Sequence, residues 1–434
     1  MEEAQRQAAI AVARVLAGMN VSAALALVAG PVTHDDGRRR ALVQELVYGT
    51  LRHWGMLDAL VKLLARKPFT DEALHALIAV ALYQLEHTRA PSFAIVDHAV
   101  NAASTLARPA AKALVNALLR RFLRERAVLA ARVRADPVAR WSHPAWWIAR
   151  VQREYPDDWR DILAAGNERP PLTLRANTRQ VSRDVLLAQL HAADIDARAV
   201  GEVGIVVQSP QPVVKLPGFA DGLFSVQDAG AQLAAPLLQL HDGMRVLDAC
   251  AAPGGKSTHI AELARAELVA IDESDARLAR VRENFARLRL PMDSTDIVAA
   301  DAGRPEGWWD GRAFDRILAD VPCTASGVIR RHPDGKWLRR ESDIAGFAQQ
   351  QSRLLDALWP LLARGGRLLY ATCSVFHAEN EGQLESFTAR HPDALREPLT
   401  FAADIAHRGG QLLPSLPGAG HNQDGFFYAL LRKA

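Results

Sequence analysis

Two of the three cysteines in this chain of 434 residues each end a short apolar run. The runs 317–323 and 367–374 contain Cys323 and Cys373 at what we expect to be the carboxyl ends of two buried strands. In an open α/β sheet, the carboxyl ends of parallel strands form the edge at which ligands bind. The placement favours thiolate chemistry. The alternative for either cysteine alone is a small buried apolar residue.

A glycine-rich turn at 248–256 follows an earlier apolar run and predicts a cofactor site, because strand, turn and helix together present backbone N–H groups to a ligand. The turn lacks the Gly-x-Gly-x-x-Gly fingerprint of a dinucleotide site. A phosphate-binding loop is a closer rival, since Gly255, Lys256 and Ser257 match its last three positions, but Cys250 replaces its first glycine. The remaining interpretation is a site for S-adenosylmethionine, which has a ribose and an adenine but no phosphate.

Acidic residues end three successive candidate strands, at Asp248, Asp272 and Asp301. Asp272 follows Cys250 at close to the interval at which an acid reaches ribose hydroxyls in doubly wound folds. Asp301 is placed to accept a hydrogen bond from the adenine amino group. An unpaired buried carboxylate is costly, so the three acids together favour a cofactor, although each alone could cap a helix.

Two thiols beside a methyl-donor turn indicate methyl transfer to a pyrimidine. Carbon 5 of a pyrimidine is a poor nucleophile and needs temporary activation before it accepts a methyl group. A thiolate that adds to carbon 6 creates an enamine whose carbon 5 attacks the methylsulfonium; a base then removes the proton and the thiol departs. Asp320, three residues before Cys323, is placed to hydrogen-bond the N3 and amino edge of the ring.

The elements that must position these residues fall into three predicted parts. Residues 1–138 are expected to form an all-α domain, because apolar residues recur there at the i, i+3, i+4, i+7 spacing of amphipathic helices. Residues 139–235 are expected to form a small α+β domain with strand-like runs at 172–175 and 203–207. Strands and helices alternate over 236–434, which predicts a Rossmann-like α/β domain with a mostly parallel sheet.

Composition excludes several classes of protein. A hydrophobic fraction of 49% and a mean hydropathy of -0.05 are typical of a soluble globular protein. Apolar stretches fall short of the roughly 20 residues that a membrane span needs. The acidic start of the chain is unlike a signal peptide, so we expect a cytoplasmic protein. Three cysteines without a Cys-x-x-Cys pair argue against a disulfide framework and are too few for an all-cysteine zinc site, and no metal is expected.

The net charge of +3 and pI of about 8.8 are only mildly basic, but the basic residues are clustered. One cluster lies within 112–134 and a second lies within 330–340, shortly after Cys323. Such patches bind phosphate backbones through counterion release, whereas the alternative is a solvated helix face.

Several segments resemble the RNA cytosine-5 methyltransferases that use S-adenosylmethionine, namely 248–256, Asp320-Val321-Pro322-Cys323, 327–334 and Ala371-Thr372-Cys373-Ser374. Segments 174–178 and 224–228 look like parts of that family ahead of its catalytic domain. The helical start, including 114–121, is similar to the NusB-like RNA-binding domain. The combination spans nearly the whole chain and resembles the bacterial enzymes of this family that act on small-subunit (16S) ribosomal RNA.

The resemblance implies that Cys373 is the nucleophile, that Cys323 assists product release, and that Asp320 binds the base and stabilises the adduct. DNA cytosine-5 methyltransferases attack instead with the Pro-Cys thiol. The commonest pattern reads Asp-Ala-Pro-Cys-Ser; Val321 and Thr324 depart from it mildly. The cofactor contacts that it implies are Cys250, Ala251, Ala252, Pro253, Gly254, Gly255, Lys256, Asp272, Asp301 and Asp320. RNA contacts are expected at Arg330, Arg331, Lys336, Arg175, Arg120 and Arg121.

We therefore expect a monomeric enzyme that methylates carbon 5 of a cytosine in small-subunit ribosomal RNA, either naked or partly assembled. The target base must be unpaired or flipped out, because a stacked ring hides carbon 6 from a thiol. The contrasting class is a non-catalytic RNA-binding or transcription factor, for which the amino-terminal domain alone would suffice. Both thiols and the strand-end acids argue against it.

Overall fold

The computed structural model of the chain describes residues 1–29, 36–65, 67–106, 110–209, 211–401, 405, 407–418 and 422–434. These residues form two compact units. Unit 1 comprises Met1–Glu168 and Ile329–Glu341, and unit 2 comprises Arg169–Val328 and Ser342–Ala434. Unit 1 therefore contains a segment that follows Cys323 closely in the sequence.

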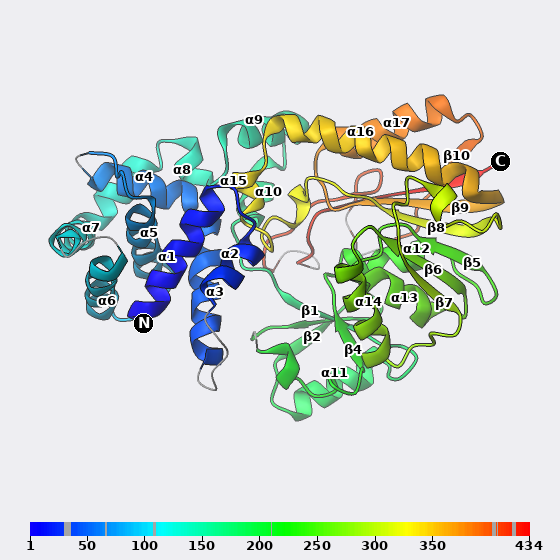
Figure 1. Cartoon of the computed structure of the whole chain (residues 1–434), viewed down its shortest axis with the longest axis horizontal. Helices are drawn as coiled ribbons and strands as arrows, with labels where there is room; N and C mark the ends of the chain where they lie inside the picture. The colour runs from blue at the N-terminus through cyan, green and yellow to red at the C-terminus, as the bar shows by residue number, and fades with distance from the viewer. Residues whose placement is uncertain are drawn as a thin grey trace. The chain divides into compact units, whose positions relative to one another are not determined.

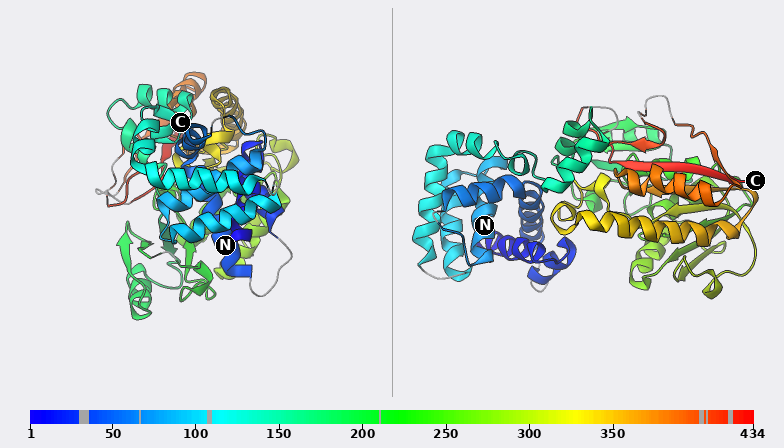
Figure 2. Two further views of the ribbon diagram at one scale, coloured as in Figure 1. Left: turned by 90° about the vertical axis from the view of Figure 1, so that its left-hand side faces the viewer. Right: turned by 90° about the horizontal axis from the view of Figure 1, so that it is seen from above.

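Unit 1 is helical, without a strand among its described residues (Figure 2). Its helices are α1 (Glu2–Leu16), α2 (Val21–Val28), α3 (Asp36–Arg52), α4 (Trp54–Leu64), α5 (Glu72–His87), α6 (Ser92–Leu106), α7 (Ala111–Val133), α8 (Pro137–Trp141), α9 (Ala145–Glu154), α10 (Trp159–Ala165) and α15 (Gly335–Leu338). In the part of the chain that is described, no helix combines the length and the apolar character that crossing a bilayer requires.

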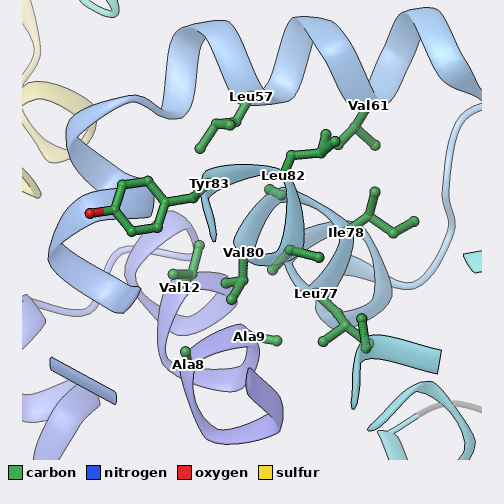
Figure 3. Close-up of a cluster of buried hydrophobic side chains, with 14 of the residues drawn as sticks. Ala8, Ala9, Val12, Leu57, Val61, Leu77, Ile78, Val80, Leu82 and Tyr83 are labelled. Atoms are coloured by element: carbon green, nitrogen blue, oxygen red, sulfur yellow. The ribbon is translucent and has the colours of Figure 1, made fainter. Parts of the chain in front are cut away.

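Helix α5 is the centre of the core of unit 1, because it is buried on every side from Ala76 to Leu85 and almost all of these residues are apolar. Its Leu77, Ile78, Val80, Leu82 and Tyr83 lie in one cluster with Ala8, Ala9 and Val12 of α1 and with Leu57 and Val61 of α4 (Figure 3). The helix begins after Asp71, whose side chain accepts a hydrogen bond from the backbone N of Leu74 at 3.0 Å.

The first part of unit 2 is a small antiparallel sheet of four strands in the order β2-β3-β1-β4. The strands are β1 (Leu172–Ala176), β2 (Ala197–Val200), β3 (Gly204–Val207) and β4 (Phe224–Val226). Helix α11 (Arg183–Ala192) begins after Ser182, which caps it, and buries Leu186 and Leu190 in the core of this sheet.

The second part of unit 2 is an eight-stranded mixed sheet in the order β10-β12-β9-β8-β5-β6-β7, with β11 paired to β12. Strands β9, β8, β5, β6 and β7 are parallel to one another, and β12 is antiparallel to β9, β10 and β11. The strands are β5 (Arg245–Asp248), β6 (Glu267–Asp272), β7 (Thr295–Ala299), β8 (Phe314–Asp320), β9 (Leu362–Thr372), β10 (Ala394–Glu397), β11 (Gln411–Leu412) and β12 (Phe426–Lys433).

Helices cover both faces of the large sheet, because its inner strands are apolar on both sides. In β5, Val246 packs into the core under α12 (Ala234–Leu237), α13 (Gly255–Leu263) and α14 (Asp275–Arg287). The next residue, Leu247, packs into the opposite core under α16 (Glu341–Leu358) and α17 (Glu381–Arg390). Figure 1 shows these two layers on opposite sides of the strands. The predicted fold class is confirmed: an all-α region, a small α+β domain and a Rossmann-like α/β domain with a mostly parallel sheet.

Candidate active site

Cys323 and Cys373 meet at the carboxyl edge of the large sheet, with their sulfur atoms 3.4 Å apart. Strands β8 and β9 are parallel neighbours in which Asp320 is paired with Ala371, so the loops that follow both strands begin at the same level. This register brings together two thiols that are 50 residues apart in the chain. Cys323 is buried and Cys373 is half-buried.

Both thiols line a cavity of about 460 Å³. Its volume lies within the range of small-molecule sites. The other predicted site residues that line it are Cys250, Ala252, Asp272, Asp301 and Asp320. The structure thus brings the predicted catalytic residues and the strand-end acids Asp272 and Asp301 to one cavity. Ala251, Pro253, Gly254, Gly255 and Lys256 belong to the same turn but are not among the residues that line the cavity.

The glycine-rich turn is held between neighbouring strands. The backbone N of Ala249 donates to the carbonyl oxygen of Leu318 at 3.0 Å, and that of Ala251 donates to Ile271 at 2.8 Å. Gly254 has a φ of +98°, and a Cβ there would lie 3.1 Å from the backbone of Val281. Glycine is therefore needed at this position for two independent reasons.

Asp272 fixes the same turn from the end of β6. Its carboxylate accepts hydrogen bonds from the backbone N of Ala252 at 3.2 Å and of Ser274 at 3.1 Å. Arg277 lies 3.4 Å from this carboxylate and donates to the carbonyl oxygen of Ala252 at 2.8 Å. Asp301 is more open: its side chain is 41% exposed and accepts a hydrogen bond from the backbone N of Gly303 at 2.8 Å.

Asp248 does not belong with these two acids, which corrects the interpretation that all three favour the cofactor. It is 1% exposed and does not line the cavity. Instead it accepts a hydrogen bond from Oγ of Ser257 at 2.6 Å, which fixes the end of β5 to the start of α13. Burial raises the pKa of Asp248 to about 7.

Lys256 points to the catalytic end of the site. Its ammonium group is ion-paired with Asp320 and lies 5.6 Å from the ring centroid of Phe426. Burial lowers the pKa of Lys256, but the Asp320 carboxylate outweighs this effect and the pKa is raised, with a further contribution from charge on Cys373. The lysine is therefore a cation that is held by the Asp320 carboxylate.

The three thiols differ in their surroundings. The hydrogen bond with Cys373, followed by burial, raises the pKa of Cys323 well above its ordinary value. Burial also raises the pKa of Cys250, and the acids around it add to the shift. Both residues therefore hold their protons at neutral pH. Because the thiolate is the nucleophilic form of cysteine, neither is ready to attack in this state.

Glu379, which sequence reasoning missed, lies beside the two thiol loops. It is fully buried at the end of a short helix, His377–Glu379, and its carboxylate accepts hydrogen bonds from Thr324 and Ser374. Thr324 directly follows Cys323, and Ser374 directly follows Cys373. The only sequence signal was an acid shortly after Cys373, which is indistinguishable from a surface glutamate.

Arg175 is not an RNA contact, which corrects its prediction. Its side chain has no exposed area and forms a bidentate ion pair with Glu262 at 2.7 and 3.0 Å. It also donates to the carbonyl oxygen of Gly255 at 2.6 Å and to Oγ1 of Thr258 at 3.1 Å. The arginine thus connects β1 of the small sheet to the cofactor turn.

Lys336 and Arg330 are also buried, with exposed fractions of 0% and 1%. The ammonium group of Lys336 donates to the carbonyl oxygen of Arg52 at 2.7 Å and to Oδ1 of Asn167 at 2.6 Å. Burial, with the charge of Arg52, lowers the pKa of Lys336 well below its ordinary value. A side chain without exposed surface cannot contact a phosphate, so the RNA-binding predictions for these two residues are corrected as well.

The three remaining basic candidates keep some exposure. Arg331 is half-buried, and on α7 Arg120 is exposed and Arg121 is half-buried. Arg120 donates to Oδ1 of Asn116 at 2.9 Å, and Arg121 pairs with Glu125 at 3.1 Å.

The fold and this site define a Rossmann-like methyltransferase domain that carries helical and α+β additions. Family models match along the chain in three parts: the NusB family over residues 3–124, a ferredoxin-like domain of RsmF/B-like methyltransferases over 143–214, and the 16S rRNA methyltransferase RsmB/F over 235–432.

Relatives match over almost the full length. Ribosomal RNA small subunit methyltransferase B of Pseudomonas putida is 47% identical over 404 residues, covering 92% of this chain and 91% of that protein. The protein of the same name from Serratia proteamaculans is 43% identical over 434 residues, with 98% and 97% covered. The crystal structure of PH0851 has a TM-score of 0.79 at 25% identity, covering 100% of this chain and 99% of that chain. The chain belongs to the ribosomal RNA small subunit methyltransferase B family, which confirms the predicted resemblance.

Proposed function

We propose that the chain transfers a methyl group from S-adenosylmethionine to carbon 5 of a cytosine in small-subunit ribosomal RNA. The observation that carries this proposal is the contact between Cys323 and Cys373 at 3.4 Å, in a cavity that Asp320 and Asp272 also line. Two thiols and a carboxyl group around one cavity are the groups that addition to carbon 6 and release of the product require. The names of the relatives support ribosomal RNA as the substrate.

The cavity residues fit S-adenosylmethionine. Cys250 and Ala252 of the glycine-rich turn line the cavity, and the carboxylates of Asp272 and Asp301 are acceptors for ribose hydroxyls and the adenine amino group. Bound there, the cofactor supplies an electrophilic methyl group. The resemblance implies that Lys256 contacts the cofactor. We instead assign Lys256 the role of holding Asp320 in place, because its ammonium group is ion-paired with that carboxylate.

We assign the attack on carbon 6 to Cys373. The raised pKa of Cys323 keeps that thiol protonated, and a protonated thiol is a poor nucleophile. Cys373 is the more exposed of the two thiols and lines the cavity, and the family resemblance assigns the nucleophile to the thiol of the Thr-Cys segment. After methylation, a base takes the carbon 5 proton, the electron pair of that C–H bond restores the double bond, and the sulfur of Cys373 leaves carbon 6 as a thiolate. Cys323, which keeps its proton, donates its S–H to the departing sulfur at 3.4 Å. Asp320 hydrogen-bonds the amino edge of the base.

The helical unit is proposed to bind the RNA through exposed arginines such as Arg120, and the enzyme is proposed to act as a cytoplasmic monomer on naked or partly assembled ribosomal RNA. Binding through α7 would be electrostatic and would weaken with salt.

Purified protein, labelled methyl donor and naked small-subunit ribosomal RNA test the proposal directly. We expect labelled 5-methylcytosine, its complete loss in Cys373→Ala, and a covalent RNA adduct that accumulates in Cys323→Ala. If Cys373→Ala trapped the RNA and Cys323→Ala turned over normally, the two roles would be reversed. Absence of labelled 5-methylcytosine with any form of the RNA substrate would contradict the proposed reaction itself.

A further inference from the structure

One buried carboxylate joins the two loops that carry the thiols. Oε1 of Glu379 accepts a hydrogen bond from the backbone N of Thr324 at 2.8 Å, and Oε2 accepts one from Oγ1 of the same residue at 2.6 Å. Oε2 also accepts a hydrogen bond from Oγ of Ser374 at 2.6 Å. Thr324 directly follows Cys323, and Ser374 directly follows Cys373. A single side chain is therefore bonded to the residue after each thiol.

Other polar groups close this network around Glu379. The side-chain nitrogen of Gln351 donates to the carbonyl oxygen of Pro322 at 2.9 Å and lies 3.4 Å from Oε1 of Glu379. Oγ of Ser326 lies 3.0 Å from Oγ of Ser374 and accepts a hydrogen bond from the backbone N of Val375 at 2.9 Å. The two loops are thus connected mainly through side chains, together with a backbone bond from Gly327 to Cys373 at 2.8 Å.

Burial of the Glu379 carboxylate carries a desolvation cost in folding free energy. Glu379 is fully buried, and burial raises its pKa although the hydroxyl and amide donors lower it. An apolar side chain of similar size would avoid this desolvation cost but would leave the buried N–H of Thr324 and the hydroxyl of Ser374 without this acceptor. What the carboxylate adds is directional hydrogen bonding to two loops at once.

We propose that Glu379 is a positioning residue that holds Cys323 and Cys373 in contact so that both thiols reach the same cytosine. The inference rests on the proposed methyltransferase reaction, in which one thiol adds to carbon 6 and the other acts on the resulting adduct. A displacement of about 1 Å in such an arrangement costs on the order of 100-fold in rate. Glu379 does not line the cavity, so it acts through the loops and not on the substrate.

Two substitutions of Glu379 distinguish the effect of its hydrogen bonds from the effect of its charge. In Glu379→Gln, the amide oxygen can accept from the backbone N of Thr324, and the amide nitrogen can donate to the hydroxyls of Thr324 and Ser374, which are able to rotate and accept. Glu379→Ala loses every one of these bonds. If the role is positional, the glutamine variant restores the function that the alanine variant loses.

The contact between the thiols can be measured without RNA or methyl donor. Oxidised glutathione exchanges with the protein dithiol to give one protein disulfide and two molecules of reduced glutathione, and the equilibrium reports the effective concentration of one thiol at the other. We expect Glu379→Ala to lower this effective concentration at least about 10-fold and kcat about 30- to 100-fold, since rate depends steeply on alignment. Glu379→Gln should stay within about threefold of the unchanged protein in both measurements, since its hydrogen bonds can re-form.

A matched control is Glu397→Gln, because Glu397 is a half-buried carboxylate on β10 that pairs with Arg367 at 2.6 Å and Arg432 at 3.0 Å. It should change neither quantity. The dissociation constant for S-adenosylmethionine should stay within about threefold in all variants, because the network lies outside the cofactor cavity. An alanine variant that keeps the thiol effective concentration, or a glutamine variant as impaired as alanine, would overturn the proposal.

Two milder variants keep the test decisive if Glu379→Ala does not fold. Thr324→Val removes one hydroxyl donor but leaves the backbone N of Thr324 bonded to Glu379. Ser374→Ala removes the bond between Glu379 and the loop of Cys373. We therefore expect Ser374→Ala to reduce the thiol effective concentration more than Thr324→Val, and the reverse order or no change in either would contradict the inference. The exchange measurement gives its answer even if the protein methylates no RNA.

Discussion

Replacing Arg175 with methionine tests whether the small α+β sheet supports the cofactor turn. The substitution would leave the Glu262 carboxylate, whose side chain is 1% exposed, without the guanidinium that now binds both of its oxygens. Breaking a buried ion pair by removing one partner costs about 3–5 kcal/mol, because the remaining charge is desolvated and uncompensated. For a unit of this size we expect a fall in Tm of roughly 6–20 °C.

Glu262 also gives the effect a pH dependence. Burial already raises the pKa of Glu262 in the folded protein, while the charge of Arg175 lowers it. Without Arg175, the folded-state pKa rises further above the unfolded value, so the folded protein binds a proton that the unfolded chain releases. The penalty is then fully present above the raised folded-state pKa and shrinks as the pH falls toward the unfolded value. The deficit of the variant should be larger at pH 8 than at pH 5.

Differential scanning calorimetry of four proteins decides the matter: the unchanged chain, Arg175→Met, Glu262→Leu and the double variant. Replacement of both partners by apolar side chains is often neutral, so the double variant should recover most of the stability that Arg175→Met loses. It should nevertheless bind S-adenosylmethionine more weakly, because the hydrogen bond from Arg175 to the carbonyl oxygen of Gly255 is absent. If Arg175→Met alone were as stable as the double variant, the reasoning about the uncompensated Glu262 charge would be refuted.

Three other outcomes follow from the same structure. Gly254→Ala should weaken S-adenosylmethionine binding and cost about 1–3 kcal/mol of stability, because the residue has a positive φ; isothermal titration with the purified protein measures the binding. Replacing the exposed Arg120 and Arg124 with glutamine should weaken RNA binding and reduce the slope of log affinity against log salt by about one for each phosphate that is no longer neutralised, and an unchanged slope would make them solvated surface charge. Lys336→Met should leave RNA affinity unchanged but destabilise the protein, because it leaves the side-chain oxygen of Asn167 without the Lys336 donor; a marked loss of RNA affinity at full stability would instead identify Lys336 as an RNA-binding residue.

The main elements of the catalytic part follow from local sequence patterns. Short apolar runs that end in Asp320 and Cys323, or in Cys373, specify buried parallel strands, and the carboxyl ends of such strands meet at one edge. The glycine turn is equally local. These features therefore predict the place where the thiols and the cofactor turn come together.

Charged side chains are predicted less well, because their role depends on partners that are distant in the sequence. Arg175 pairs with Glu262, which lies 87 residues later in the chain, and no residue near Arg175 in the sequence indicates this partner. Lys336 donates to Asn167 across 169 residues. Both residues look like solvated charges until the fold supplies the acceptor. Glu379 shows the opposite difficulty, since a glutamate in a polar segment that also contains Asn380 and Glu381 gives no sign that it will be fully buried.

The assignment of Ile329–Glu341 to unit 1 has a consequence for biosynthesis. This segment supplies Asp334, which accepts from the backbone N of Val21 at 3.0 Å, and Trp337, whose indole donates to the carbonyl oxygen of Leu51 at 2.8 Å. A ribosome that makes this protein releases the first ten helices long before α15 leaves its exit tunnel. The amino-terminal body can therefore reach its final packing only after most of the catalytic sheet has been translated, which couples the maturation of the two bodies in time.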